Sequence, residues 1–385
     1  MASLNFTNET CFYNLTEKET LDYLYKPFGK YFILVIVPLI SSFGLFGNLS
    51  FLYVVFRTPH LQNITNFYLG SLAIADALLL FSGGVQYLWS YTRSYGLDFD
   101  AAFIFGSPVS CSTPNFLVYL CYFASVFLVT FVTMERYSAI CHSLSYRVSK
   151  RRAIIFIAVA WIVSLILTGF QIPFSEVRIV CVSWPPEEDV FNGFPDQIPV
   201  CFHACDWCLY LTVWADFIQY IIAVPAVSFM SLSMARGMRR SLKLTKRMSI
   251  RSTSSIRARQ NLVMMVQINA LVFFLCLTPY EIMNLNEILG KSEFLTTEQA
   301  HYLKWVGRIT MLVNAAVNPL IYSIVNPVYR QAFIHACCCC CYGHDGSCKC
   351  RTTATSTHPT KNQQRYEMVD KIEARNGIQT PNKIE

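Results

Sequence analysis

The sequence predicts an all-α membrane protein, built as a seven-transmembrane helix bundle with a short cytoplasmic amphipathic eighth helix. Hydrophobic residues make up 54% of the 385 positions and charged residues only 14%. The apolar residues gather in seven blocks, each close to the roughly 20 residues that carry a helix across a bilayer. Because lipid offers the backbone no hydrogen bonds, these blocks must be helices. We expect the spans at residues 31–56, 66–90, 108–141, 153–173, 208–234, 261–285 and 302–325.

Charge sets the expected orientation of this bundle. Nine Lys or Arg and no Asp or Glu lie between residues 236 and 259, and further basic residues crowd positions 147–152. Lys and Arg favour cytoplasmic loops, so we expect both segments inside the cell and the acidic amino-terminal tail outside. The net charge of +7 follows from this bias. We therefore expect a multi-pass plasma-membrane protein, and no nucleic-acid partner.

The chain divides into three parts by composition. Residues 1–30 are expected to form an extracellular glycosylated tail, 31–336 the seven-helix domain with its surface helix, and 337–385 a cytoplasmic tail that is cysteine-rich and then disordered. Asn5, Asn8 and Asn14 lie in sequons for glycosylation. A metal site that includes His344 is one interpretation of the cysteine run. The other, which we favour, is lipidation in the bilayer surface at Cys337, Cys338, Cys339, Cys340 and Cys341.

Particular polar residues and prolines mark the spans in order. Each alone has a plain structural explanation, such as a tolerated kink or interfacial packing. They are Asn48, Asp76, Glu135-Arg136-Tyr137, Trp161, Pro225, Phe273 with Pro279, and Asn318-Pro319 with Tyr322. As an ordered set they resemble the rhodopsin-like family of G-protein-coupled receptors, over about residues 30–335.

The resemblance implies a switch and an ion site. In the family, the arginine is held by its neighbouring acid at rest and is freed to meet the G protein. The residues that match this coupling and switch role are Glu135, Arg136, Tyr137, Phe273, Pro279, Asn318, Pro319 and Tyr322. The residues that match a sodium site are Asp76, Ser125, Asn314 and Asn318. A hydrogen-bonded polar core without an ion is the alternative, and no other cofactor is expected.

Three positions depart from the family pattern. Leu277 stands where tryptophan is usual, Ser233 where tyrosine is often found, and Arg259 where a second acid often restrains the switch. Arg259 would repel Arg136 rather than hold it. We therefore expect the restraint at rest to depend largely on Glu135.

Six cysteines are expected on the outer side, and six cysteines allow fifteen pairings. The resemblance implies a disulfide between Cys111 and Cys201, and we expect a second between Cys181 and Cys205. In the long loop before the fifth span, residues 176–183 alternate as a strand does and are expected to pair with residues 200–203.

The outer half of the bundle indicates the class of ligand. Val118 replaces the aspartate of amine receptors and Leu312 the retinal lysine of opsins, which disfavours both ligands. An amide-rich and aromatic cleft suits a short peptide. The alternative is that the tyrosines pack the bundle and Glu281 pairs with Arg308. The expected ligand-binding residues are Gln86, Tyr87, Asn115, Tyr119, Tyr122, Tyr280, Glu281, Asn284, Lys304 and Arg308.

The sequence therefore predicts a receptor that binds an extracellular neuropeptide and activates a heterotrimeric G protein. The segment from Arg57 to Ala73 looks most like receptors of the thyrotropin-releasing-hormone and FMRFamide type. Arrestin and a receptor kinase are implied as cytoplasmic partners. No arrangement of nucleophile and base, metal ligands or phosphate loop indicates an enzyme. The alternatives are a non-peptide ligand on the same fold and an ion-conducting or transport protein.

Overall fold

The computed structural model describes residues 11–98, 109–141, 149–186, 189–247, 253–289 and 297–338. Within these ranges seven helices are long and apolar enough to cross a membrane. They are Pro27–Arg57, Ile64–Arg93, Asn115–Cys141, Lys150–Phe174, Trp207–Arg240, Gln260–Asn286 and Tyr302–Val325. The seven predicted spans are thus confirmed, and the chain is a multi-pass membrane protein.

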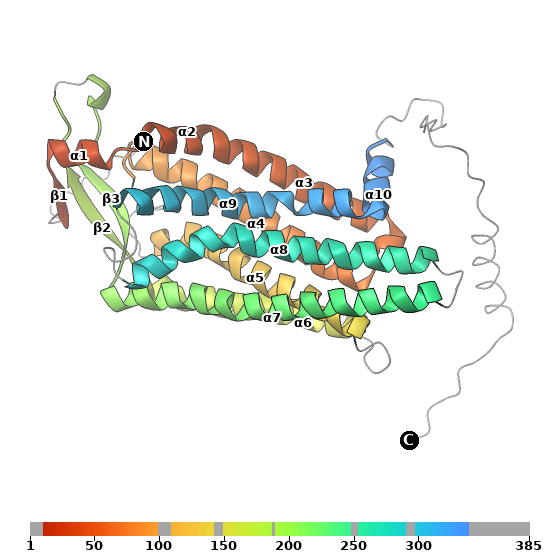
Figure 1. Ribbon diagram of the computed structural model, residues 1–385. Coiled ribbons are helices and arrows are strands. Elements are labelled where there is room, and N and C mark those ends of the chain that lie inside the picture. Colours follow the sequence, from red (N-terminus) through yellow and green to blue (C-terminus); the bar gives the residue numbers. More distant parts are fainter. Residues whose placement is uncertain are drawn as a thin grey trace. The chain divides into compact units, whose positions relative to one another are not determined.

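The helices form one bundle of the residues up to Ala336 (Figure 1). The first span is a continuous helical segment of α2 (Pro27–Tyr31), one π-helical turn (Phe32–Ile36) and α3 (Val37–Arg57). The other helices are α4 (Ile64–Arg93), α5 (Val109–Cys141), α6 (Lys150–Gln171), α7 (Asp206–Arg247), α8 (Thr253–Leu289), α9 (Thr297–Val325) and α10 (Pro327–Cys338). Helix α7 continues through Pro225, as α8 and α9 continue through Pro279 and Pro319.

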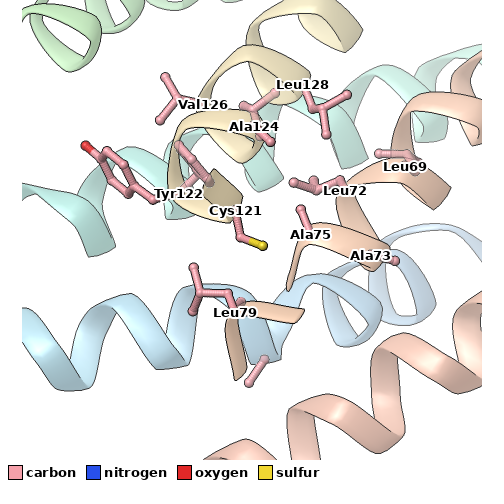
Figure 2. Packing of buried hydrophobic residues seen from close by; sticks show 14 of the residues in the cluster. Leu69, Leu72, Ala73, Ala75, Leu79, Cys121, Tyr122, Ala124, Val126 and Leu128 are labelled. Atoms are coloured by element: carbon pink, nitrogen blue, oxygen red, sulfur yellow. The ribbon is translucent and has the colours of Figure 1, made fainter. Parts of the chain in front are cut away.

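Helix α5 lies centrally, because it packs against α4, α6, α7 and α8. Leu69, Leu72 and Ala75 of α4 face Cys121 and Ala124 of α5 across this contact (Figure 2), and all five are at most 1% exposed. Small side chains here let the two helix backbones approach closely, which is how membrane helices gain packing energy without a hydrophobic driving force.

The contact between α3, α4 and α9 depends on a glycine. A Cβ atom added at Gly44 would lie 2.6 Å from the Ala316 Cβ and 2.7 Å from a Leu80 methyl carbon. Asn48, one turn further along α3, donates from Nδ2 to the backbone carbonyls of Gly44 and Ala315, both at 2.9 Å. The first marker residue of the sequence therefore joins α3 to α9.

A small sheet covers one end of the bundle, which we call the sheet end (Figure 1). Strand β2 (Ser175–Val182) pairs antiparallel with β3 (Gln197–His203), with Val180 opposite Ile198. This confirms the predicted hairpin. Strand β1 (Tyr13–Leu15) was not expected, and it pairs parallel with β2 just before helix α1 (Glu17–Tyr23). Short 3-10 turns (Pro59–Leu61, Ile172–Phe174 and Asp189–Phe191) complete the described elements.

Three disulfides between described residues tie the sheet end together. Cys111 at the start of α5 bonds to Cys201 of β3, with the two Cα atoms 5.5 Å apart. The expected Cys181–Cys205 bond is wrong. Because β1 runs beside β2, the Cα atoms of Cys11 and Cys181 lie 5.6 Å apart and the two cysteines form a disulfide. Cys205 bonds to Cys208 at the first turn of α7.

Several predicted modification sites fall outside the described residues. Asn5 and Asn8 precede them, and Asn14 lies exposed on β1. Cys339, Cys340, Cys341 and His344 follow them. Cys337 and Cys338 end α10, and their side chains are outside the described set.

Candidate functional site

At the end of α5 that lies away from the sheet, the Glu135 carboxylate holds Arg136 with both oxygens. The Arg136 Nε donates to Oε2, and Nη2 donates to Oε1 at 2.8 Å. The side chains are only 5% and 17% exposed, respectively. Thr65 of α4 adds a hydroxyl bond to Glu135 Oε2 at 3.5 Å. Two opposite charges thus satisfy each other in a geometry that gives strong, directional hydrogen bonds.

Arg136 has this one acidic partner among the described ion pairs. The side chain of Arg259, which stands where a second acid is usual, lies outside the described residues. Tyr137 of the same triplet turns its ring to Phe229 of α7, with the ring centres 6.3 Å apart. The contact that restrains Arg136 is therefore local to α5 and the first turn of α4.

Further into the bundle, Asp76 of α4 meets Asn318, a marker residue of the seventh span, whose Nδ2 donates to Asp76 Oδ2 at 2.5 Å. Within the described part of the chain, four buried oxygens here have no hydrogen-bond partner: Asp76 Oδ1, Ser125 Oγ, Asn314 Oδ1 and Asn318 Oδ1. All four residues are at most 4% exposed. Oxygen donors that include one carboxylate suit a hard cation, so the predicted sodium-site residues fit that ion.

The junction of α9 and α10 carries the motif tyrosine. The Tyr322 ring packs against Phe51 of α3 at 4.9 Å and against Tyr329 of α10 at 6.2 Å between ring centres. Tyr329 donates its hydroxyl to Asn66 Oδ1 of α4. Burial raises the pKa of Tyr329 to about 12, so this hydroxyl keeps its proton and remains a donor at neutral pH. Tyr322 of α9 is thus packed between α3 and α10.

The middle of α8 lacks the usual tryptophan. Leu277 fills that position and is 1% exposed, and Phe273, one turn earlier, is buried to the same extent. The Phe273 ring meets Phe274 edge-on at 5.3 Å. Phe274 in turn lies 5.8 Å from Tyr220 of α7, which bonds to Thr278 at 2.8 Å. An aromatic contact between α7 and α8 therefore lies close to Leu277, the position at which the usual tryptophan is missing.

Nearer the sheet end, a buried acid of α8 contacts α5. Glu281 is 2% exposed. Its Oε1 accepts from the Tyr122 hydroxyl, and its Oε2 accepts from Asn284 Nδ2 at 3.4 Å. The alternative that Glu281 pairs with Arg308 is not found among the described ion pairs. Arg308 instead lies over the rings of Tyr87, at 5.2 Å, and Trp305, at 5.0 Å, because α9 presents it to the aromatic side chains near α4.

A second buried acid lies close by on α7. Asp216 is 2% exposed and accepts from Gln171 Nε2 of α6 at 3.4 Å and from the Tyr280 hydroxyl of α8 at 3.3 Å. Asp216 belongs to no family marker and was therefore not among the predicted site residues. An acid within a membrane span is nevertheless a functional signal in itself. A search of every predicted span for acidic residues would have identified Asp216.

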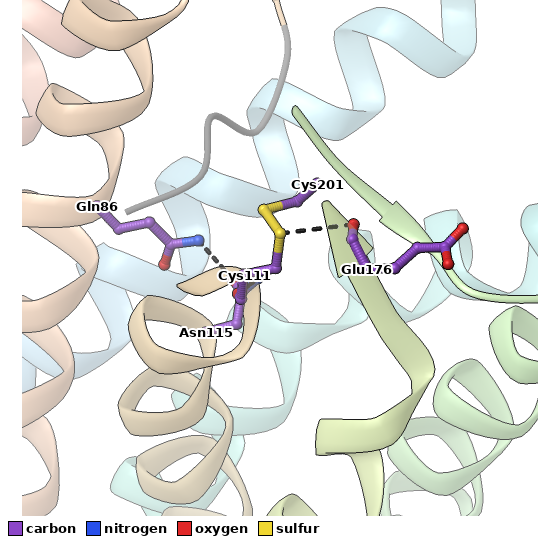
Figure 3. Close-up of a disulfide and its surroundings, with 5 residues drawn as sticks. All are labelled: Gln86, Cys111, Asn115, Glu176 and Cys201. Carbon is purple, nitrogen blue, oxygen red and sulfur yellow. Dashed lines mark hydrogen bonds between the residues drawn. A yellow bond between two sulfur atoms is a disulfide. The ribbon is translucent and has the colours of Figure 1, made fainter. Parts of the chain in front are cut away.

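The remaining predicted ligand residues are divided between two places. Gln86 of α4 donates to Asn115 of α5 directly beneath the Cys111–Cys201 disulfide, whose Cys111 sulfur lies 3.5 Å from the Glu176 carbonyl oxygen (Figure 3). Lys304 of α9 forms an ion pair with Asp98 at 3.1 Å. Lys304 thus lies with the loop after α4 rather than in the bundle interior.

A cavity of about 130 Å³ opens between α5, α6, α7 and β3. Of the predicted ligand residues, Asn115 and Tyr119 line it. The other lining residues are Phe116, Thr168, Gln171, Ile172, Ser175, Cys201, Phe202, His203 and Thr212. Ligand pockets usually measure roughly 300–1,000 Å³, so this cavity has room for one side chain rather than for a whole peptide.

Comparison with known proteins decides the family. The profile of the 7 transmembrane receptor (rhodopsin family) matches residues 47–322, which is more than half of the chain. The chain belongs to the rhodopsin family. As a rhodopsin-family receptor it is not an enzyme, and the resemblance seen in the ordered span markers is confirmed.

Curated relatives of this rhodopsin-family receptor include receptors named for neuromedin-U, thyrotropin-releasing hormone and RYamide. The rat (Rattus norvegicus) neuromedin-U receptor 2 is 27% identical over 307 residues, covering 78% of this chain and 73% of the relative. The mouse (Mus musculus) thyrotropin-releasing hormone receptor is 24% identical, with 79% and 78% covered. The RYamide receptor of Drosophila melanogaster is 23% identical, with 80% and 64% covered.

Proposed function

We propose that this receptor binds an extracellular neuropeptide at the sheet end and activates a heterotrimeric G protein at the opposite end. The observation that carries the proposal is the buried polar cluster of Tyr122, Glu281 and Asn284 below the sheet, with the half-buried Tyr280 packed against Tyr122. A membrane bundle without a ligand to bind has little reason to bury an acid, a tyrosine and an amide in one place. The similarity to receptors named for peptides supports the same conclusion.

The proposal places the amino terminus outside the cell and the receptor in the plasma membrane. Two observations support this orientation, namely the disulfides at one end and the distribution of basic residues at the other. The disulfide-bonded sheet stands at one end, which suits an oxidising compartment. The basic residues at the end of α7 and the start of α6 lie at the other end, as positive residues do on the cytoplasmic side.

The energy for activation would come from the ligand's preference for an alternative arrangement of the bundle. Tyr122 and Glu281 join α5 to α8, and a peptide that replaces this hydrogen bond frees α8 from α5 near the sheet. At the opposite end, the same separation gives Arg136 room to leave Glu135 and meet the G protein. The α7–α8 aromatic contact around Phe273 would transmit the change in place of the absent tryptophan.

Sodium is proposed as an allosteric ion of the inactive state. Asp76, Ser125, Asn314 and Asn318 would hold it through the four oxygens that otherwise lack a hydrogen bond among the described residues. A positive ion there would offset the cost of a buried carboxylate. In the tail, the proposal includes lipidation of the cysteine run, and phosphorylation by a receptor kinase followed by arrestin binding.

The proposal is tested with the full chain expressed in cells. A library of amidated short peptides is screened for calcium and cyclic-nucleotide responses, with untransfected cells as the control. Active peptides are then tested for stimulation of nucleotide exchange on purified G protein. Responses to small lipids with none to peptides would reject the peptide assignment.

Arg136→Ala separates binding from coupling. Arg136 lies far from the sheet end in sequence and structure, so we expect peptide binding to remain measurable while G-protein nucleotide exchange is lost. A matched control is Arg178→Ala, which removes an ion pair with Glu176 on β2 and leaves the coupling end intact. Exchange that continues undiminished in Arg136→Ala would contradict the assigned role.

A further inference from the structure

Two acids share one buried network near the sheet end. Asp216 of α7 and Glu281 of α8 are each 2% exposed. Tyr280 donates to Asp216, Tyr122 donates to Glu281, and the two tyrosine rings meet edge-on with their centres 5.9 Å apart. The carboxylates are therefore joined through two touching side chains.

Among the described residues, every hydrogen-bond donor to these acids is neutral. Asp216 receives hydrogen bonds from Gln171 and Tyr280, and Glu281 receives them from Tyr122 and Asn284. The ion pairs of the described residues use other acids, namely Glu135, Glu176 and Asp98. Within the described chain, then, two buried carboxylates have hydrogen bonds but no positive charge.

Such an arrangement is costly unless a cation arrives. Desolvation disfavours a buried carboxylate, and a second carboxylate nearby disfavours it further. A single positive group placed between them would gain from both. Hydrogen bonds between a guanidinium or ammonium and a carboxylate are stronger than the neutral ones seen here. The faces of the tyrosine rings add an attraction for the same kind of group.

The network adjoins the cavity below the sheet. Gln171, which donates to Asp216, lines that cavity, and so do Tyr119 and Thr212. The other amide atom of Gln171, Oε1, is buried without a hydrogen-bond partner among the described residues. Gln171 therefore links the cavity to Asp216, through a long 3.4 Å hydrogen bond that a basic ligand side chain would replace.

We propose that Asp216 and Glu281 form a cation subsite that receives one basic group of the ligand, a guanidinium or an ammonium. The proposal rests on the proposed receptor function and adds the charge of the ligand to it. The tyrosines then turn from holding the acids to lining the bound group. A basic side chain that draws Asp216 and Glu281 together would pull α7 and α8 toward it from both sides.

The first test uses small probes with one charge each. The purified full chain in detergent is heated with N-acetyl-L-argininamide, N-acetyl-L-lysinamide or the uncharged isostere N-acetyl-L-citrullinamide, and the unfolding temperature is recorded. We expect the arginine or lysine probe to raise it and the citrulline probe not to. Which of the two charged probes acts distinguishes a guanidinium from an ammonium. Equal shifts with all three probes, or none with any, would overturn the proposal.

Variants locate the effect. Glu281→Gln and Asp216→Asn should each abolish the shift, whereas Glu17→Gln, which removes one exposed acid from α1, should keep it. Unfolding temperatures without probe show which variants are folded, and either network variant suffices if the other fails. A shift retained in the folded network variants would place the cation elsewhere.

The second test uses the peptide screen, and it separates the two proposals. Replacing the basic residue of an active peptide by citrulline or norleucine should lower its potency about 10- to 100-fold on the wild type, as expected for charge-assisted hydrogen bonds, and much less on Glu281→Gln. If the probes bind but no peptide activates the receptor, the proposed peptide function is rejected and the cation subsite is retained. Active peptides that are indifferent to this replacement would sink the subsite and leave the function.

Discussion

Replacing Glu135 with Gln removes the negative charge that holds Arg136 and changes the side-chain volume little. A hydrogen bond to a charged group contributes about 1.5–3 kcal/mol and a neutral one about 1 kcal/mol. Arg136 is only 17% exposed, so water screens the pair little. The glutamine retains one acceptor but turns a donor toward the guanidinium. We therefore expect a net loss of about 1–2 kcal/mol from the restrained arrangement.

That loss converts into signalling without ligand. Each 1.4 kcal/mol is about a tenfold change in an equilibrium constant, so the active fraction should rise about 5- to 30-fold where it starts small. The assay is ligand-independent nucleotide exchange on G protein, measured in membranes with matched receptor surface levels. Glu135→Asp, which keeps the charge, is the matched control and should rise less. Thr65→Val removes only the 3.5 Å contact and should have a small effect.

An unchanged basal rate in Glu135→Gln would refute the role of Glu135 as the main restraint on Arg136. Because the described part of the chain offers Arg136 no other acid, a second restraint would then have to come from elsewhere. Equal rises in Glu135→Gln and Glu135→Asp would show that packing rather than charge holds the arginine.

Three further outcomes follow from the contacts. Asp76→Asn should remove any sodium dependence of agonist affinity in binding assays, and dependence that persists would place the ion elsewhere. Tyr329→Phe loses the hydrogen bond to Asn66 and should lower the free energy of unfolding by about 0.5–1.5 kcal/mol. An unchanged free energy of unfolding would contradict a stabilising role for this bond. Gly44→Ala places a methyl group against Ala316 and should lower the free energy of unfolding by about 1–3 kcal/mol, measured by thermal unfolding. No change would show that α3 and α9 separate there at no cost.

The helices were predictable because their signal is local. A run of apolar residues long enough for the bilayer admits one backbone solution, and the seven spans follow from it. The hairpin of β2 and β3 was predictable for a similar reason, since its strands alternate and lie close in sequence. Strand β1 was not, because three residues pair in parallel with a strand more than 160 positions later. The wrong partner for Cys181 follows from that omission.

The candidate site divides in the same way. Glu135 and Arg136 are adjacent in sequence, so their pairing needs no knowledge of packing. The Asp76–Asn318 contact was expected through the family resemblance. Asp216 was missed because no motif marks it, and its significance appears only once α6, α7 and α8 bring Gln171 and Tyr280 to it. Rotation of a helix about its axis, which decides such contacts, is not fixed by hydropathy.

The Cys11–Cys181 bond changes what a protease can do to this receptor. Lys18 lies exposed on α1, and a cut after it would sever the backbone between the tail and the first span. The released piece would nevertheless stay attached to β2 through its cysteine, together with all three predicted glycan acceptors. Shedding this piece would require both a cut and a reductant. A receptor nicked there would migrate as one species on a non-reducing gel and as two after reduction.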